Sequence, residues 1–359
     1  MAIEPTYPDQ VMGCLLGGAL GNALGYAQQQ ATTPEDTLAM LRRAAGGLPF
    51  AEDTQLTLYT VDGLVDALEW ANDGVAADET ACLWLAYLRW LATQGEVPAP
   101  IAPSPPPRPI DGHAVLRARR NPGSTSITGL LTGDMGTRHR PVNRSAQDAG
   151  ALSRSAPFGL VPRIPLSMVD RLTRDAAALT HGHSAAKTAA AVFASLIHRL
   201  AVEAMPFDEA VRKAAEQAGA ADDDGLAAAL NRAVALAAAG NTPASAGLPA
   251  ELGSGWTADE ALARAIYTVL AAVPGRDAGN VAEELSRSGA EHILAAVQLA
   301  VGSGGNTATT GSLVGNLMGT RYGIEAFPDA WLDLVEGTGV VREMASALIG
   351  AVAGEKSRL

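Results

Sequence analysis

The chain has 359 residues and a formal net charge of -12, and 48% of its residues are hydrophobic but only 4% are aromatic. The negative charge excludes non-specific binding to nucleic acid or to an anionic membrane surface. A core with so few aromatic residues must be built from Ala, Leu and Val, and alanine-rich runs favour helices. Few segments show β-branched alternation. The composition therefore predicts an all-α fold, which we take as one compact domain over residues 1–359.

The two cysteines, Cys14 and Cys82, lie in apolar helical patterns, where they are expected to be buried small hydrophobic residues. They imply no disulfide framework, which fits a cytoplasmic protein. The uncharged run 11–27 has no basic segment before it and is short and rich in glycine. We therefore interpret it as neither a signal sequence nor a membrane span.

Two segments carry glycine every fourth residue, at 11–27 and at 310–322. This spacing places the glycines on one helix face. A glycine face costs about 1 kcal/mol per residue relative to Ala, which is tolerable where another backbone approaches closely. The two helices are therefore predicted to pack against each other, with the polar loop 301–309 at the buried centre of the domain. The glycines are Gly13, Gly17, Gly21 and Gly25 in the first helix, and Gly311, Gly315 and Gly319 in the second.

The remaining pattern is a series of amphipathic helices. One begins near residue 53, with Asp53 or Thr54 as its N-cap. The proline-dense stretch 95–111 is predicted to be a semi-rigid surface loop, or alternatively a polyproline ligand for a partner. Further helices are predicted at 34–45, 78–92, 114–118, 124–131, 166–179, 184–202, 207–218, 225–239, 256–272, 280–285, 291–300, 330–337 and 340–352.

Two helix heads far apart in the sequence are rich in oxygen ligands. Glu52 and Asp53 head one helix, and Asn306 and Thr309 head the other. If the glycine-rich helices bring these heads together, they could form a site for a hard cation. The alternative is that Asp53 and Thr309 are ordinary caps.

Three further residues could contact a ligand. His181 and His183 lie two apart in a short turn, so their side chains need not converge on one ion; one imidazole could face a ligand or be structural. Arg154 lies in an apolar context and needs an acidic side chain or a phosphate as its partner.

These residues carry a resemblance to the ADP-ribosylglycohydrolase family, the relatives of dinitrogenase reductase activating glycohydrolase. Residues 13–25 resemble the family's opening GxxxGxxxGDAxG helix, and residues 52–57 stand where the family has Thr-Asp-Asp-Thr. Residues 141–160 resemble its central loop and Met-Arg-x-x-Pro ending. Residues 180–183 match its His-Gly-His turn, and 304–323 match its Gly-Asp-x-Asp-Thr motif with the following helix.

The resemblance implies an all-helical fold with a central cleft. It implies a pair of Mg²⁺ ions, held by the two acidic motifs, that grip the ribose hydroxyls of an ADP-ribosyl group and assist hydrolysis at its anomeric carbon. The catalytic residues would be Glu52 and Asp53. The ligand-binding residues that the resemblance implies are Asn143, Ser145, Gly150, Ser153, Arg154, His181, Gly305 and Asn306.

The sequence departs from the family at the metal motifs. Asn22 replaces the aspartate of GDAxG, Ala51 and Glu52 replace the first Thr and Asp of Thr-Asp-Asp-Thr, and Asn306 and Ala308 replace both aspartates of the second motif. Neutral side chains are poor ligands for Mg²⁺. We expect one ion at most, on Glu52, Asp53 and Thr309. In the central loop, Gln147 and Asp148 stand near replaced glycines, and Ser153 replaces Met.

The sequence-based hypothesis is a protein that binds ADP-ribose or an ADP-ribosylated protein, with two-Mg²⁺ hydrolysis impaired. The first alternative is an active ADP-ribosyl hydrolase that uses one metal ion or none, with Glu52 or Asp53 as general base. The second is a partner-binding protein with an empty cleft. We expect a monomer, and the alanine-rich, lysine-poor composition suggests a bacterial source.

Overall fold

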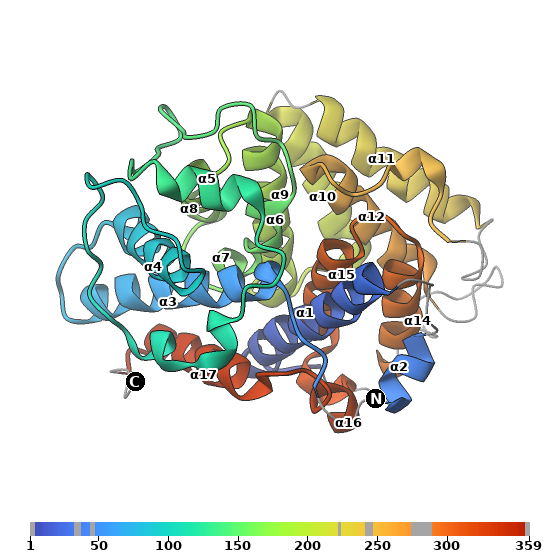
Figure 1. Cartoon of the computed structure of the whole chain (residues 1–359). Helices are drawn as coiled ribbons and strands as arrows, with labels where there is room; N and C mark the ends of the chain where they lie inside the picture. The colour runs from blue at the N-terminus through green and yellow to red at the C-terminus, as the bar shows by residue number, and fades with distance from the viewer. Residues whose placement is uncertain are drawn as a thin grey trace.

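The computed structural model describes residues 4–31, 37–43, 47–221, 224–240, 247–273 and 289–355. These residues form helices joined by loops, which confirms the predicted all-α class (Figure 1). Their only β-type pairings are two isolated bridges, Leu48 with Val335 and Asp148 with Thr257. No helix in the described ranges combines the length and apolar character needed to span a membrane.

Most predicted helices lie within two residues of the observed ones at each end. The observed helices are α1 Tyr7–Gln30, α2 Thr37–Arg43, α3 Glu52–Asn72, α4 Glu79–Thr93, α5 Ser124–Leu131, α6 Gly150–Ser153, α7 Ala156–Gly159, α8 Leu166–Ala178, α9 Ser184–Ala201, α10 Phe207–Ala220, α11 Asp224–Ala239, α12 Ala258–Ala271, α14 Gly289–Gly302, α15 Thr307–Tyr322, α16 Asp329–Leu332 and α17 Thr338–Ala353. The predicted helix 280–285 and part of 34–45 lie outside the described residues.

Two of the shorter predictions were wrong in detail. Residues 114–118 form a 3₁₀ turn, Ala114–Arg117, instead of an α-helix. The helix predicted over 330–337 ends at Leu332. It stops there because the backbone beyond it pairs with Leu48, which accepts a hydrogen bond from the Glu336 N–H at 2.9 Å.

Helices α1 and α15 cross the centre of the molecule in direct backbone contact, as their glycine spacing predicts (Figure 1). The helices are antiparallel, so the glycines pair in reverse order along the chain. A Cβ atom on Gly13 or on Gly17 would lie 2.5 Å from the carbonyl oxygen of the glycine opposite it. The approach is therefore possible only without side chains, and it brings together the two ends of the sequence.

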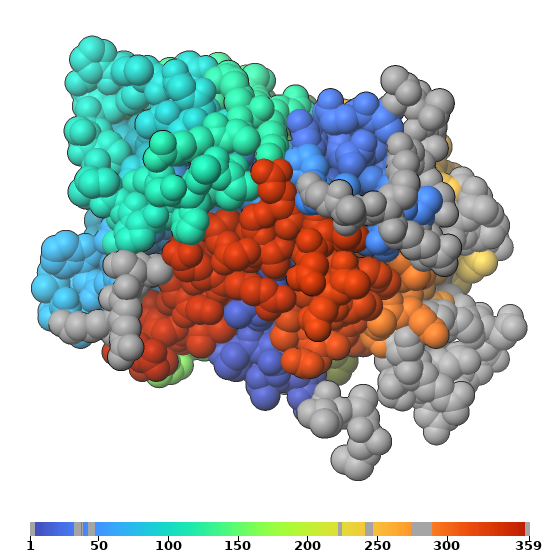
Figure 2. Space-filling model, turned by 60° about the horizontal axis from the view of Figure 1, so that its bottom comes forward, coloured from blue at the N-terminus to red at the C-terminus, as the bar shows by residue number. Residues whose placement is uncertain are grey.

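The other helices pack around this pair. Helix α3 packs on α4, and α17 covers both α1 and α3. Helix α9 contacts α7, α8, α10 and α12 on the opposite side, and its residues 189–194 are fully buried. In Figure 2 the C-terminal segment occupies the middle of the visible face, beside the segment that precedes α5.

The polar loop 301–309 does not lie at the buried centre, contrary to the prediction. Val301 and Gly302 end α14, Gly302, Gly304 and Gly305 are exposed, and the buried residues of the stretch are Val301 and residues 306–309. Gly304 and Gly305 have φ values of +67° and +72°, which residues with side chains rarely adopt. The loop therefore turns at the surface before α15 enters the core.

The proline-dense segment ends in an ion-pair cluster. Arg108 pairs with Asp62 at 2.8 Å and with Asp66 and Glu69 at 3.2 Å each. These contacts tie the end of the segment to α3. The alternative of a polyproline ligand for a partner stays a prediction.

We predict that Gly21→Ala lowers the free energy of unfolding by about 3 kcal/mol, because the new Cβ would overlap the backbone of Gly311. The matched control is Gly350→Ala in α17. Its Cβ would meet only the flexible Glu355 side chain, at 3.5 Å, so it should gain up to about 1 kcal/mol from helix propensity. Urea denaturation of both variants measures the difference. Equal stabilities would contradict the close backbone contact.

Candidate functional site

A polar cavity of about 270 Å³ opens where the N-terminal ends of α3, α5, α6 and α15 meet. It therefore joins segments that are far apart in the sequence. Its walls combine polar side chains with the small or aromatic side chains of Ala51, Ala149, Trp256 and Ala308. The lining residues are Gln29, Ala51, Glu52, Asp53, Asn121, Gly123, Ser124, Thr125, Ser126, Asp148, Ala149, Gly150, Trp256, Asn306, Ala308 and Thr309.

Asn22 connects α1 to α3 and α15. Its Oδ1 accepts hydrogen bonds from the Ala51 N–H at 2.7 Å and from the Thr54 hydroxyl at 3.1 Å. Its Nδ2 donates to Oδ2 of Asp53 at 3.0 Å. The N-cap of α3 is Ala51, so the predicted caps Asp53 and Thr54 were wrong. Both residues lie inside the first turn because Asn22, from another helix, holds the Ala51 N–H.

Glu52 is buried, and one of its carboxylate oxygens accepts a hydrogen bond from the Gly123 N–H. The other oxygen, Oε1, has no hydrogen-bond partner in the described residues although it is shielded from solvent. Burial, and next the adjacent charge of Asp53, raise the pKa of Glu52 to about 7. The carboxyl group can therefore exchange a proton near neutral pH.

Asp53 is surrounded by donors. Its Oδ2 accepts hydrogen bonds from the Asn22 amide and from the Thr309 hydroxyl, each at 3.0 Å. Burial raises the pKa of Asp53, while the Ser153 and Thr309 hydroxyls and the charge of Arg154 oppose this rise. The carboxylate thus lies where α1, α3 and α15 converge.

Arg154 lies behind the cavity wall and is 1% exposed. Its guanidinium lies 4.6 Å from the centre of the Tyr87 ring and donates hydrogen bonds to the Thr180 hydroxyl and, at 3.4 Å, to the Gly150 carbonyl. No carboxylate of the described residues lies within ion-pair distance of it. Its positive charge nevertheless lowers the pKa of both Glu52 and Asp53.

Thr180 and His181 extend this arrangement to Asp148. The Thr180 hydroxyl accepts from Arg154, so it can donate its own proton to Nδ1 of His181 at 2.7 Å. This leaves the proton of the neutral imidazole on Nε2, which lies 2.7 Å from Oδ1 of Asp148. His181 is fully buried, and burial lowers its pKa. His181, the Thr125 hydroxyl and the Gly150 N–H outweigh burial and lower the pKa of Asp148.

The remaining predicted ligand residues lie in different places. Gly150 and Asn306 line the cavity, whereas Ser153 is buried behind it and Gly305 lies on the adjoining surface. Asn306 is the N-cap of α15, where its side chain accepts from the Thr309 N–H at 3.3 Å. Thr309 is therefore not the cap.

The central loop carries the other two predicted ligand residues away from the cavity wall. Asn143 donates hydrogen bonds to the carbonyls of Thr125 at 2.9 Å and Thr180 at 3.0 Å, and so holds the central loop in place. Ser145 is exposed.

A second hollow of about 470 Å³ continues from the cavity and shares Gln29, Asn121 and Trp256 with it. Its far side is the turn that contains Gly304 and Gly305. Trp256 is 54% exposed, and its carbonyl accepts a hydrogen bond from the Ala149 N–H at 3.2 Å. This hydrogen bond holds the backbone of Trp256 in place, and its exposed side chain lines both hollows.

The donor set does not fit a pair of divalent cations. Glu52 and Asp53 are the only carboxylates at the predicted metal positions, and the described residues hold no cluster of three or more His, Cys, Asp or Glu placed to bind a metal ion. Asn22 also directs an N–H donor at Asp53, and such a donor disfavours a cation on that oxygen.

Several lining residues were missed by the sequence reasoning. Asn121, Gly123 and Ser126 follow the proline-dense segment, and no spacing signal relates that loop to Glu52. Asp148 was noted only as a departure in the central loop. Trp256 was predicted as the first residue of a helix, whereas α12 begins at Ala258 and leaves Trp256 in the preceding loop, at the cavity.

Comparison with solved structures finds another protein with the same fold. A structure titled "ADP-ribosylglycohydrolase-related protein complex" matches with a TM-score of 0.60 and 22% sequence identity, over 95% of this chain and 97% of the other. No curated protein matches the sequence. The sequence profile of ADP-ribosylglycohydrolase matches residues 3–358. The chain therefore belongs to the ADP-ribosylglycohydrolase family, as the motifs predicted.

Stability should depend on pH through Glu52. The pKa of Glu52 is raised from an ordinary 4.5 to about 7, so the folded state keeps a proton that the unfolded state has lost between these values. The free energy of unfolding should therefore fall as pH rises from 4.5 to 7. Glu52→Gln should remove on the order of 2 kcal/mol of this fall.

Chemical denaturation between pH 5 and pH 8, at about half-unit steps, measures this effect. Glu325→Gln, at an exposed position, is the control and should follow the wild-type profile. A Glu52→Gln variant with the same pH profile as the wild type would show that Glu52 does not titrate in this range.

Proposed function

We propose that this protein binds the ADP-ribosyl group, free or attached to a protein, without the two-Mg²⁺ hydrolytic site of its family. Family membership supports the ligand class. The observation that carries the rest is the network at Asp53, where an amide and a hydroxyl take the positions around a buried carboxylate. Protein donors thus satisfy an oxygen that would otherwise need a cation.

The cavity is suited to a ribose with free hydroxyls. Oε1 of Glu52 is a buried acceptor without a donor, and a ribose hydroxyl can supply that donor. Asp148 adds an ionised carboxylate on another wall, and Ser124 and Thr125 add neutral donors. The adjoining hollow gives room for the rest of a nucleotide, with the Trp256 indole available for stacking.

The test is calorimetric titration of ADP-ribose into the protein with Mg²⁺ and then with EDTA. We expect the same dissociation constant in both conditions. Asp53→Ala should reduce affinity about tenfold, because it removes a carboxylate of the cavity lining that also orders the Asn22 and Thr309 side chains. Ser145→Ala is the control and should bind as the wild type does, since Ser145 is exposed outside the cavity lining. Binding that is lost in EDTA would refute the metal-independent proposal.

Trp256→Ala should weaken ADP-ribose binding by about 1–3 kcal/mol, the range for base stacking on an aromatic side chain. The matched control is Trp70→Ala on α3, because Trp70 is 50% exposed but lies outside both hollows. The same titration applied to ribose 5-phosphate, which has no base, should show no loss in Trp256→Ala. An equal loss for both ligands would assign Trp256 a structural role.

A second candidate function is slow hydrolysis of the glycosidic bond. The unpartnered Oε1 of Glu52 and its pKa of about 7 favour proton transfer at that position. This function would show as turnover of ADP-ribosylated arginine or serine peptides that persists in EDTA and is lost in Glu52→Gln.

A further inference from the structure

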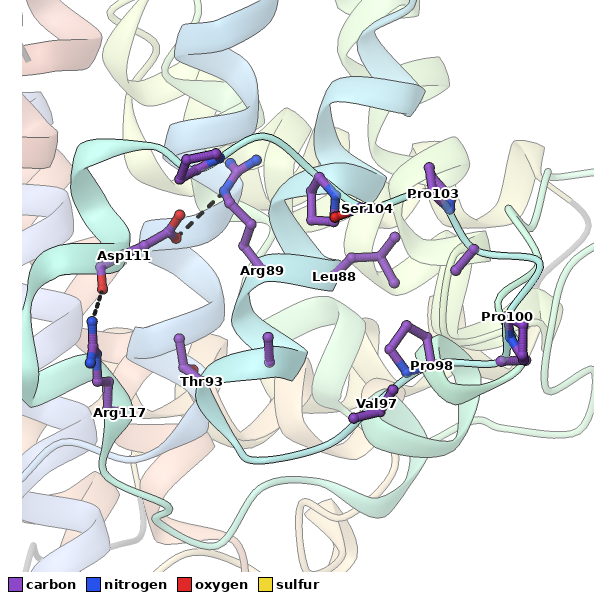
Figure 3. Close-up of a pocket in the computed structure, with 15 residues that line it drawn as sticks. Leu88, Arg89, Thr93, Val97, Pro98, Pro100, Pro103, Ser104, Asp111 and Arg117 are labelled. Carbon is purple, nitrogen blue, oxygen red and sulfur yellow. Dashed lines mark hydrogen bonds and ion pairs between the residues drawn. The ribbon is translucent and has the colours of Figure 1, made fainter.

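A larger pocket, of about 630 Å³, lies between α4 and the proline-dense segment (Figure 3). In the described residues it has no lining residue in common with the cavity at Glu52 and Asp53. Leu88 and Ala92 of α4 form its floor, and the prolines of residues 98–107 form the opposite wall. The volume is in the range of small-molecule sites.

The wall is rigid before anything binds. Proline fixes φ near -65° and has few side-chain states to lose, so a wall of prolines gives a preformed surface at low entropic cost. Hydrogen bonds hold both ends of the segment: the Ala99 N–H donates to the Leu131 carbonyl at 3.0 Å, and the Arg108 N–H donates to Asp111 at 2.9 Å. Val97 on the rim is 82% exposed, so the apolar surface faces solvent.

One end of the pocket is polar, and its charged lining residues are Arg89, Arg117 and Asp111. Figure 3 shows Arg89, Asp111 and Arg117 together there, away from Pro98, Pro100 and Pro103. Arg89 is 5% exposed; it pairs with Asp62, and its Nε donates no hydrogen bond and lies 3.5 Å from Oδ1 of Asp111.

Arg117 is the arginine of the pocket lining that has no carboxylate in direct contact in the described residues. It is exposed and donates to the backbone carbonyl of Asp111 at 3.0 Å. Within the described part of the chain no carboxylate lies within ion-pair distance of it. Asp111 is already occupied by Arg89, by the Tyr59 hydroxyl at 3.2 Å and by the Arg108 N–H. The pocket therefore presents a guanidinium that lacks an anion, beside an apolar wall.

We propose that this pocket binds a small organic carboxylate with an apolar, ring-containing body. The guanidinium of Arg117 can donate hydrogen bonds to both oxygens of a carboxylate, and the proline rings and Leu88 can pack against a flat apolar group. This site is separate from the proposed ADP-ribosyl site and does not depend on its function.

The experiment is calorimetric titration with phenylbutyrate and with its neutral analogue phenylbutyramide. The carboxylate should bind on the order of tenfold more tightly than the amide. Arg117→Gln should remove this difference and leave amide binding unchanged, which isolates the charge interaction. Arg140→Gln, an exposed arginine outside the pocket lining, should keep the difference.

Ala92→Phe tests the location. Ala92 is exposed on α4 and lines the pocket, so a phenyl group there fills the pocket without entering the core. This variant should lose both ligands while keeping the wild-type melting temperature and ADP-ribose affinity. No heat from the carboxylate at millimolar concentration overturns the proposal. Equal binding of acid and amide overturns it too, and so does binding that survives Ala92→Phe.

Discussion

The contact between α1 and α15 determines the rest of the structure. Their glycines allow two backbones to touch, and the contact places Asn22 of α1 beside Ala308 and Thr309 of α15. The N-terminus of α3 then meets both helices at Asp53. A shift of either helix by one turn would separate these groups, so the glycine spacing fixes the site as well as the core.

Protein groups offset part of the cost of burying charge at this site. Glu52 and Asp53 are adjacent and shielded from water, which is costly for two like charges. The raised pKa of Glu52 reduces the negative charge of the pair near neutral pH. The positive charge of Arg154, behind the wall, stabilises the carboxylate forms of both residues. Arg154 is itself held by an aromatic face and neutral acceptors, so its charge acts on the carboxylates without a direct ion pair. Asn22 and Thr309 complete the shell around Asp53.

Much of the fold could be predicted from the sequence, because helix periodicity and the glycine pattern are local signals. The pairing of the two glycine-rich helices and most helix ends followed from them. The cap of α3 could not be predicted, because the group that decides it lies on another segment. Asn22, 29 residues before Ala51, accepts a hydrogen bond from the N–H of this N-cap residue of α3. The cap of α15 is local, since Asn306 accepts from the N–H of Thr309 three residues later.

Three of the motifs identified in the sequence reach the cavity, at the heads of α3 and α15 and at the start of α6. Arg154 and His181, in contrast, are buried behind its wall. These residues position the wall through hydrogen bonds. Arg154 donates to the Thr180 hydroxyl, and that hydroxyl donates to Nδ1 of His181 and so fixes its tautomer. Nε2 of His181 then donates to Asp148 at the cavity edge. Asp148 in the central loop thus adds a third carboxylate to the opening, beside Glu52 and Asp53 at the head of α3. The His181 imidazole, the Thr125 hydroxyl and the Gly150 N–H stabilise its negative charge there.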